Sequence, residues 1–399
     1  FLILFFTTTA KAQKEAETFN VDSTLYEYYQ RCQEYLLEPV VLSMSDTLFR
    51  MAGERHDERM QAVAIATRLD YYYFQGTNED SVIHYTNKVK EFAKATHQPK
   101  YYYFAWANRL VTYYLKTSRT NIALYEVQNM LKEAQKEDDK TGLSRCYNIM
   151  SQIYTIKRFD SMAFEWRLKE IELTEKYNIE NYNISQTYAQ IANYYISQKK
   201  QKEALRAVEK AISTANSSTQ QISAKLEYVN YYSKFGDFQA AEKILKECQI
   251  AFEQDKRLES IKKRLYNIEC LYYQQTRQYQ KALEAAEMQE KEEHRLSESI
   301  LSSSHYRTQG EIYQKMGNMN MAVKYLQMYI NTDDSLKIAN EQVASSEFAT
   351  LLNVEKLNAE KKELMLQAQE KELHNKTTLI ISLIILSVSY THLTLPTNS

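Results

Sequence analysis

The chain has 399 residues and a net charge of −1, with 50 basic and 51 acidic side chains. Because the two signs balance, the composition argues against a basic surface for a nucleic-acid backbone, and we expect this segment to bind no nucleic acid. Only 6 Gly and 3 Pro accompany 33 Tyr, which excludes the glycine-rich turns of an α/β enzyme and predicts an all-α fold.

The first twelve residues, FLILFFTTTAKA, form an apolar run that ends in an Ala-x-Ala pattern. This arrangement is typical of the end of a secretory signal peptide. We expect residues 1–12 to be the remnant of one, which places the body of the protein outside the cytoplasm. The alternative interpretation is an apolar helix of the mature fold. Residues 20–59 then predict a degenerate N-terminal helical pair, interrupted at Pro39.

Residues 60–334 repeat one pattern, in which a tyrosine is followed nine positions later by a small residue. Successive tyrosines of the pattern lie 37 to 42 positions apart. The tyrosines are Tyr72, Tyr114, Tyr154, Tyr195, Tyr232, Tyr273 and Tyr313, and the small residues are Ser81, Ala123, Ala163, Ala204, Ala241, Ala282 and Ala322. A fixed period of this kind predicts an array of structural repeats.

The clearest unit is HYRTQGEIYQKMGNMNMAVKYLQMYI, residues 305–330. Counted with residue 303 as position 1, positions 4, 8, 11, 15, 20 and 24 of the unit hold Tyr306, Gly310, Tyr313, Gly317, Ala322 and Leu326. These positions resemble the tetratricopeptide repeat, in which small residues at positions 8 and 20 let two antiparallel helices approach closely. The resemblance implies a helical solenoid of about seven to eight helix pairs. Val111 and Ser151 replace the small glycine at position 8 in two weaker units.

No residue pattern for catalysis is present. The sequence lacks a phosphate-binding loop, a zinc-protease motif and a nucleophile elbow, and its seven histidines are scattered. We therefore expect no catalytic residue, metal or cofactor in this segment, and we expect that it is not an enzyme. The cysteines have no C-x-x-C spacing and are predicted to be inert buried thiols; they are Cys32, Cys146, Cys248 and Cys270.

Polar side chains on the first helix of each pair are the candidate binding residues. The resemblance implies that positions 2, 5, 9 and 12 of these helices face a groove. The candidates are Asn108, Arg145, Asn148, Gln152, Asn193, Asn230, Arg264, Asn267, Gln274 and Arg307. An Asn amide can donate to and accept from a peptide backbone without imposing a sequence, so these residues predict a protein or peptide partner. The alternative is a hydrated groove without a ligand.

Two aromatic runs, residues 71–74 and 101–104, look like boxes for a ligand. Consecutive residues of a helix point to different faces, so only one or two of each run can line one surface. We expect them to pack within and between the repeats, in preference to forming a ligand cage.

Residues 335–376 contain no Gly or Pro and predict a long connector helix. A modest coiled-coil pattern allows a parallel homodimer, and a single hydrated helix is the alternative; the pattern is Leu336, Val343, Leu357 and Leu364. Residues 377–387 predict a truncated transmembrane helix, because the apolar run is shorter than the roughly 20 residues that a span needs. Residues 388–399 look like a translated sequencing adapter, an artefact; a genuine polar C-terminus is the alternative.

The order of these segments resembles the membrane-anchored tetratricopeptide regulators of Bacteroidetes-type bacteria. The resemblance implies a sensor region that binds a protein or peptide, with the repeat array in the periplasm and the C-terminal helix in the inner membrane. Its output domain, a DNA-binding or histidine-kinase module, would lie beyond this sequence. A periplasmic scaffold that assembles proteins without signalling is the alternative.

Overall fold

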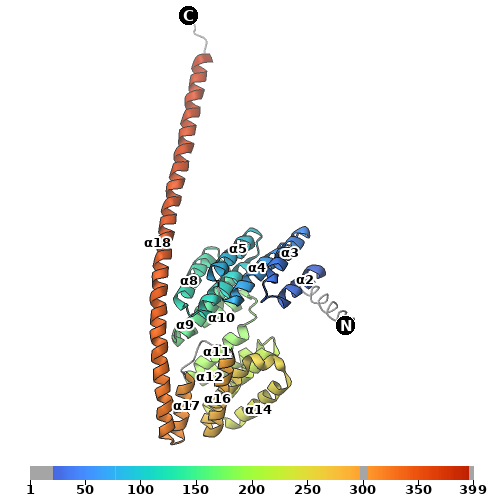
Figure 1. The fold of residues 1–399 in the computed structure, drawn as a ribbon, viewed down its shortest axis with the longest axis vertical. Helices are drawn as coiled ribbons and strands as arrows, with labels where there is room; N and C mark the ends of the chain where they lie inside the picture. The colour runs from blue at the N-terminus through green and yellow to red at the C-terminus, as the bar shows by residue number, and fades with distance from the viewer. Residues whose placement is uncertain (1–20, 77, 297–303, 395–399) are drawn as a thin grey trace. The chain divides into compact units, whose positions relative to one another are not determined.

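The structure is a computed structural model that describes residues 21–76, 78–296 and 304–394, and every regular element in these ranges is a helix (Figure 1). The helices are α2 (Ser23–Glu34), α3 (Val40–Glu54), α4 (Glu58–Gln75), α5 (Glu79–Ala95), α6 (Pro99–Tyr103), the π helix η1 (Phe104–Val111), α7 (Thr112–Lys116), α8 (Thr120–Lys136), α9 (Lys140–Ile156), α10 (Asp160–Tyr177), α11 (Ile184–Ser197), α12 (Gln201–Ser213), α13 (Ser218–Phe235), α14 (Phe238–Gln254), the 3-10 helix η2 (Lys256–Ile261), α15 (Lys262–Gln275), α16 (Tyr279–Leu296), α17 (Ser304–Lys315) and α18 (Met319–Thr394). The predicted all-α class is confirmed.

The helices follow one another as pairs joined by short turns. Within the described ranges there are eight pairs, and η1 and η2 form parts of first helices. The pairs are α2/α3, α4/α5, α6–η1–α7/α8, α9/α10, α11/α12, α13/α14, η2–α15/α16 and α17/α18. The contacts divide the chain into two compact units, residues 1–340 and 341–399. The first unit holds the solenoid of helix pairs that the repeat pattern predicts.

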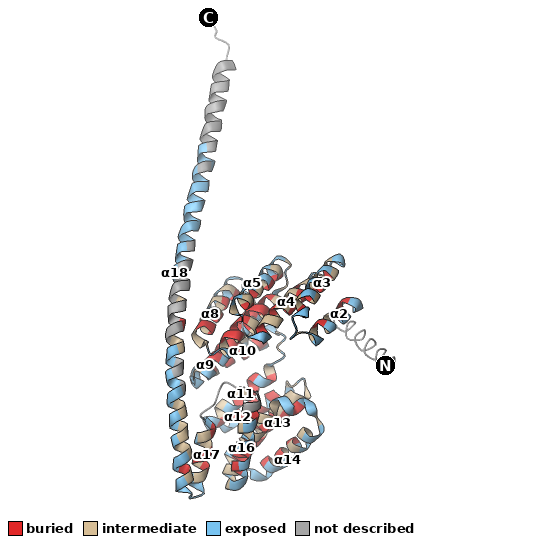
Figure 2. Ribbon diagram, viewed as in Figure 1, coloured by how far each residue is buried: buried red, intermediate tan, exposed pale blue. Residues whose placement is uncertain are grey.

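The repeating small residues belong to the buried core of the helix pairs, whose buried residues are red in Figure 2. Six alanines at the position nine after the tyrosine are at most 2% exposed; they are Ala123, Ala163, Ala204, Ala241, Ala282 and Ala322. In the clearest unit, a Cβ atom added to Gly310 would lie 2.8 Å from Cγ of Leu326. A larger side chain would force the paired helices apart, so the repeat pattern records a packing requirement.

Helix length accounts for the one short period in the array. Tyr195 and Tyr232 are 37 positions apart, and the pair between them, α11/α12, has helices of only 14 and 13 residues. The next pair, α13/α14, has helices of 18 and 17 residues. The weak unit with Val111 at the small position is also distinctive, since its first helix widens into the π helix η1.

Many of the described turns between helices use a left-handed backbone conformation. Glycine supplies it in three of them, where Gly76, Gly236 and Gly317 have φ values of 69°, 91° and 79°. In eight further described turns a residue with a side chain takes this conformation, as Asn178 (φ 49°) and Lys199 (φ 56°) do. Lysine pays a steric cost in this region of φ/ψ space that glycine avoids.

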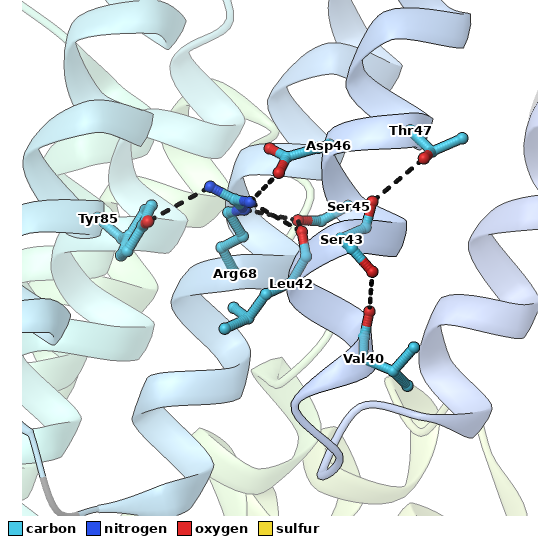
Figure 3. Close-up of polar contacts among 8 residues, drawn as sticks. All are labelled: Val40, Leu42, Ser43, Ser45, Asp46, Thr47, Arg68 and Tyr85. Carbon is cyan, nitrogen blue, oxygen red and sulfur yellow. Dashed lines mark hydrogen bonds and ion pairs between the residues drawn. The ribbon is translucent and has the colours of Figure 1, made fainter.

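Arg68 of α4 joins the first helix pair to the rest of the array (Figure 3). Its guanidinium donates to Ser45 Oγ at 2.8 Å and to the Leu42 carbonyl at 2.8 Å, and it pairs with the Asp46 carboxylate, all on α3. On the other side it donates to the Tyr85 hydroxyl of α5 at 3.4 Å. One side chain thus links α3, α4 and α5.

All four cysteines are buried and unpaired. Burial raises the pKa of the Cys32 thiol to about 11 and that of Cys146 to about 12. The reactive thiolate is therefore scarce at neutral pH, which agrees with the predicted inert thiols.

The second helix of the last pair, α18, extends through the predicted connector, residues 335–376. In the part of the chain that the structure describes, no helix combines the length and the apolar character that a membrane crossing requires. The transmembrane prediction for residues 377–387 is therefore not confirmed. The predicted signal-peptide remnant and residues 395–399 lie outside the described ranges.

Candidate functional site

An internal ion pair occupies the first helices of the N-terminal repeats. Arg109 of η1 donates to both carboxylate oxygens of Asp70 on α4, with Nε–Oδ1 at 2.5 Å and Nη2–Oδ2 at 3.2 Å. The guanidinium carbon lies 4.4 Å from the ring centroid of Phe104 and 4.9 Å from that of Tyr73. The two aromatic runs therefore surround a cation that the chain itself supplies, as a packing role requires. Asn108 lies beside this pair and is half-buried.

A second internal arrangement, the Glu170 cluster, consists of Asn148, Gln152, Glu170, Asn181 and Thr187. The Glu170 side chain on α10 is 1% exposed. Its carboxylate accepts hydrogen bonds from Asn148 Nδ2 (3.2 Å to each oxygen), Asn181 Nδ2 (2.8 Å) and Thr187 Oγ1 (3.4 Å). Gln152 Nε2 donates to Asn148 Oδ1 at 2.7 Å. Two candidate binding residues, Asn148 and Gln152, are thus engaged within the protein.

Burial dominates the electrostatics of the Glu170 cluster. Removal of the carboxylate from water raises the pKa of Glu170, while the hydrogen bonds from Asn181 and Asn148 act in the opposite direction. The exposed candidate Arg145 lies close enough to favour the ionised form. The cluster connects α9, α10, the segment 178–183 and α11, so it is a structural joint between consecutive helix pairs.

A different arrangement, the Glu227 cluster, crosses three neighbouring first helices. It consists of Asn193 on α11, Glu227 and Asn230 on α13, and Arg264 on α15. Glu227 is 3% exposed and pairs through Oε1 with Nη2 of Arg264. Its other oxygen, Oε2, accepts a hydrogen bond from Asn230 Nδ2 at 3.1 Å, and the same nitrogen donates to Asn193 Oδ1 at 3.5 Å.

The Glu227 cluster forms one wall of a pocket of about 450 Å³. Four candidate binding residues line it together, namely Asn193, Asn230, Arg264 and Asn267. The other lining residues are Ala189, Gln190, Glu227, Ser260, Ile261, Lys263, Ile268, Leu271 and Gln289. The pocket therefore combines amide donors and acceptors, cationic groups and an apolar wall on adjacent helices.

The remaining candidates lie apart from this pocket. Gln274 donates through Nε2 to Cys270 Sγ at 3.3 Å and accepts from Lys315 Nζ at 3.1 Å. Arg307 is exposed and pairs with Glu311 at 2.8 Å. Among the described residues, no group of three or more His, Cys, Asp or Glu side chains is placed to hold a metal ion.

The two carboxylates that organise these clusters were not among the sequence candidates. Glu227 lies three positions before Asn230, so the two share a helix face, and this spacing could have drawn attention to it. Glu170 lies on the second helix of its pair, outside the positions expected to face a groove. Its role depends on Asn181, whose segment carries no repeat signal.

Known protein structures resemble this chain in fold. No protein-family model and no curated protein matches this sequence. The apo form of the quorum sensor NprR from B. thuringiensis is similar in structure, with 14% identity over 80% of this chain and 91% of that chain and a TM-score of 0.50. A tetratricopeptide repeat protein from Parabacteroides merdae has 14% identity over 81% and 99% of the two chains, with a TM-score of 0.43. A Rap protein complexed with competence and sporulation factor has 11% identity over 79% and 99%, with a TM-score of 0.46.

The helix pairs, the buried small residues and the likeness in fold to NprR together define a helical-repeat protein. Within that class, the chain has a tetratricopeptide-repeat fold, which confirms the resemblance seen in the repeat units. The likeness to the membrane-anchored regulators of Bacteroidetes stays a prediction.

Proposed function

We propose that the pocket on α11, α13 and α15 binds an extended segment of a protein or peptide partner. The observation that carries the proposal is the convergence of Asn193, Asn230 and Asn267 on one pocket. Asparagine amides match the alternating N–H and C=O groups of an extended backbone. Ile261, together with the 37%-exposed Leu271, offers an apolar surface for one side chain of the segment.

The fold supports this role in a general way. Helical-repeat arrays present long surfaces on which side chains from successive repeats contact one partner. The fold neighbour NprR is a quorum sensor, but the likeness is one of fold alone, so the proposal rests on the pocket. The ion pair of Asp70 with Arg109 and the Glu170 cluster engage the corresponding polar groups of the N-terminal repeats internally. Binding is therefore proposed for the C-terminal repeats.

Panning a phage-displayed library of random dodecapeptides against the full chain tests the proposal. We expect peptides that bind the wild type and lose about tenfold or more in affinity on the double variant Asn193→Ala, Asn230→Ala, because two neutral hydrogen bonds are removed. The control double variant Gln198→Ala, Asn331→Ala replaces two exposed amides outside the pocket and should bind as the wild type does. Equal binding by the pocket variant, or no enrichment at all, would remove the pocket as a peptide site.

We also propose that this binding region belongs to a membrane-anchored signal-transduction protein, with the array in the periplasm. The support is the order of segments in the sequence. The complete reading frame is the test, because a full apolar span followed by a DNA-binding or kinase module is expected. A stop codon directly after the apolar run would favour the scaffold without signalling.

A further inference from the structure

We infer that Glu227 is a positioning residue that fixes the hydrogen-bonding polarity of the Asn193–Asn230 pair and thereby sets the direction in which a peptide lies in the pocket. The inference rests on the proposed peptide-binding function and assigns to this site one orientation of its ligand.

The carboxylate of Glu227 is a buried hydrogen-bond acceptor beside Asn230. An ionised carboxylate accepts hydrogen bonds and donates none. Glu227 is 3% exposed, and its Oε1 pairs with the guanidinium of Arg264, as a carboxylate does. Asn230 lies 3.1 Å from Oε2, so the atom that faces Glu227 must be the amide nitrogen. The acid therefore selects one of the two amide orientations of Asn230.

The hydrogen bonds of the Asn193–Asn230 pair engage a different atom of each amide. Asn230 Nδ2 has two hydrogens, and its two acceptors are Glu227 Oε2 at 3.1 Å and Asn193 Oδ1 at 3.5 Å. Asn230 therefore presents its Oδ1 to the pocket as an acceptor. Asn193 uses its Oδ1 toward Asn230 and presents its Nδ2 to the pocket as a donor. Two chemically identical side chains acquire opposite roles.

The two asparagine amides can pair with the N–H and the C=O of one residue of an extended peptide. In an extended chain, the N–H and C=O groups of one residue point to the same side. Such a residue would donate its N–H to Asn230 on α13 and offer its C=O to Asn193 on α11. Because the N–H precedes the C=O in every residue, the peptide runs from α13 toward α11. Its N-terminal end then lies toward α15.

Backbone ester substitution measures this polarity directly. The probe is the tightest-binding dodecapeptide from the panning, made with an ester in place of each backbone amide in turn, which removes one N–H at a time. On the wild type, we expect one central ester to weaken binding about fivefold, as loss of one neutral hydrogen bond does. On Glu227→Gln the penalty at that position should fall below twofold, because a glutamine can donate as well as accept and lets the Asn230 amide turn.

The acceptor-only variant Glu227→Asp distinguishes positioning from structural support. It should bind the amide peptide more weakly but keep the ester penalty, since its carboxylate still cannot donate. If Glu227 only supported the structure, amide and ester peptides would weaken together and the penalty would be the same in Glu227→Gln. An unchanged penalty in that variant overturns the inference and leaves the peptide-binding function intact.

Hydrogen exchange of the side-chain amides in the peptide-free protein tests the positioning role of Glu227 separately from peptide binding. In the free wild-type chain, the Asn230 side-chain NH₂ should exchange with solvent more slowly than that of Asn267, which has no hydrogen-bond partner among the described residues. Glu227→Gln should abolish the difference. Equal exchange of the two amides in the wild type overturns the positioning role, whatever the panning yields.

A spin label on the peptide tests the direction. With a nitroxide on the N-terminus, we expect line broadening of α15 resonances more than of α11 resonances, and the reverse with the label on the C-terminus. The opposite pattern contradicts the inference.

Discussion

The Glu170 and Glu227 clusters contain the same kinds of residue and do different things. Each is built around a carboxylate that is at most 3% exposed, and each carboxylate accepts a hydrogen bond from an asparagine on a first helix. Around Glu170, the amides of Asn148 and Asn181 are used up inside the protein. Around Glu227, the asparagines line a pocket.

The difference comes from how each buried charge is compensated. Glu227 pairs with the guanidinium of Arg264, which reaches it from the neighbouring first helix. One cation satisfies one carboxylate oxygen, so fewer amides are needed. Among the described residues, no cation donates a hydrogen bond to Glu170, and neutral donors from three segments take that place. A buried acid with an arginine leaves amides for a ligand, and one without an arginine consumes them.

The largest expected effect is on stability at Glu170. Replacement of Glu170 by Ala removes the buried acceptor that the half-buried amides of Asn148 and Asn181 share, and should lower the free energy of unfolding by about 2–4 kcal/mol. The exposed Glu180 in the adjacent segment is the control, and Glu180→Ala should stay within about 0.5 kcal/mol of wild type. Urea unfolding followed by circular dichroism measures both. A loss below about 1 kcal/mol for Glu170→Ala would mean that water satisfies the donors.

Replacing an asparagine of the Glu170 cluster should lower stability, whereas replacing one of the Glu227 cluster should lower peptide affinity. Asn148→Ala removes a donor from the buried Glu170 and should cost about 1–2 kcal/mol of stability while leaving peptide affinity within about twofold. Asn193→Ala should leave stability within about 0.5 kcal/mol and weaken peptide binding about fivefold. Unfolding curves and calorimetric titration on the same two variants decide it. The comparison breaks if Asn148→Ala weakens binding as much as Asn193→Ala does.

The pH dependence of stability should have opposite signs at two glutamates. Burial raises the pKa of Glu170, so the folded state holds its proton more tightly than the unfolded state does. Relative to Glu170→Gln, the wild type should therefore lose stability as pH rises from the ordinary glutamate value toward the raised one. The hydrogen bond from Tyr188 lowers the pKa of Glu175, so relative to Glu175→Gln the wild type should gain stability as pH rises through that lowered value.

Thermal unfolding from pH 3 to pH 7 of the wild type and both variants gives the two difference curves. Slopes of the same sign would show that burial does not dominate at Glu170.

The sequence predicted the fold because the repeat is a packing rule. Small residues such as Ala204 and Ala241 are buried at the same place in successive helix pairs, so the requirement appears at a regular spacing. The candidate site was predicted only in part. Asn193 and Asn230 occupy positions that the repeat defines, but whether an amide stays available depends on nonrepeating partners. Asn181 and Arg264 decide that outcome, and their contacts with Glu170 and Glu227 span 11 and 37 positions of sequence.

The smallest expected effect concerns the backbone conformation of one turn residue near each cluster. Lys199 lies in the turn between α11, which carries Asn193 of the Glu227 cluster, and α12; Asn178 follows α10, which carries Glu170; both have positive φ. Asparagine adopts this conformation at a lower steric cost than lysine, so Lys199→Gly should raise stability by about 0.5 kcal/mol, after the greater freedom of glycine in the unfolded chain is counted. Asn178→Gly should change stability by less than about 0.3 kcal/mol either way. Differential scanning calorimetry of the two variants provides the measurement. A loss above about 1 kcal/mol for Asn178→Gly would show that the Asn178 side chain supports the joint, and the Glu170 cluster would then extend along the whole connecting segment.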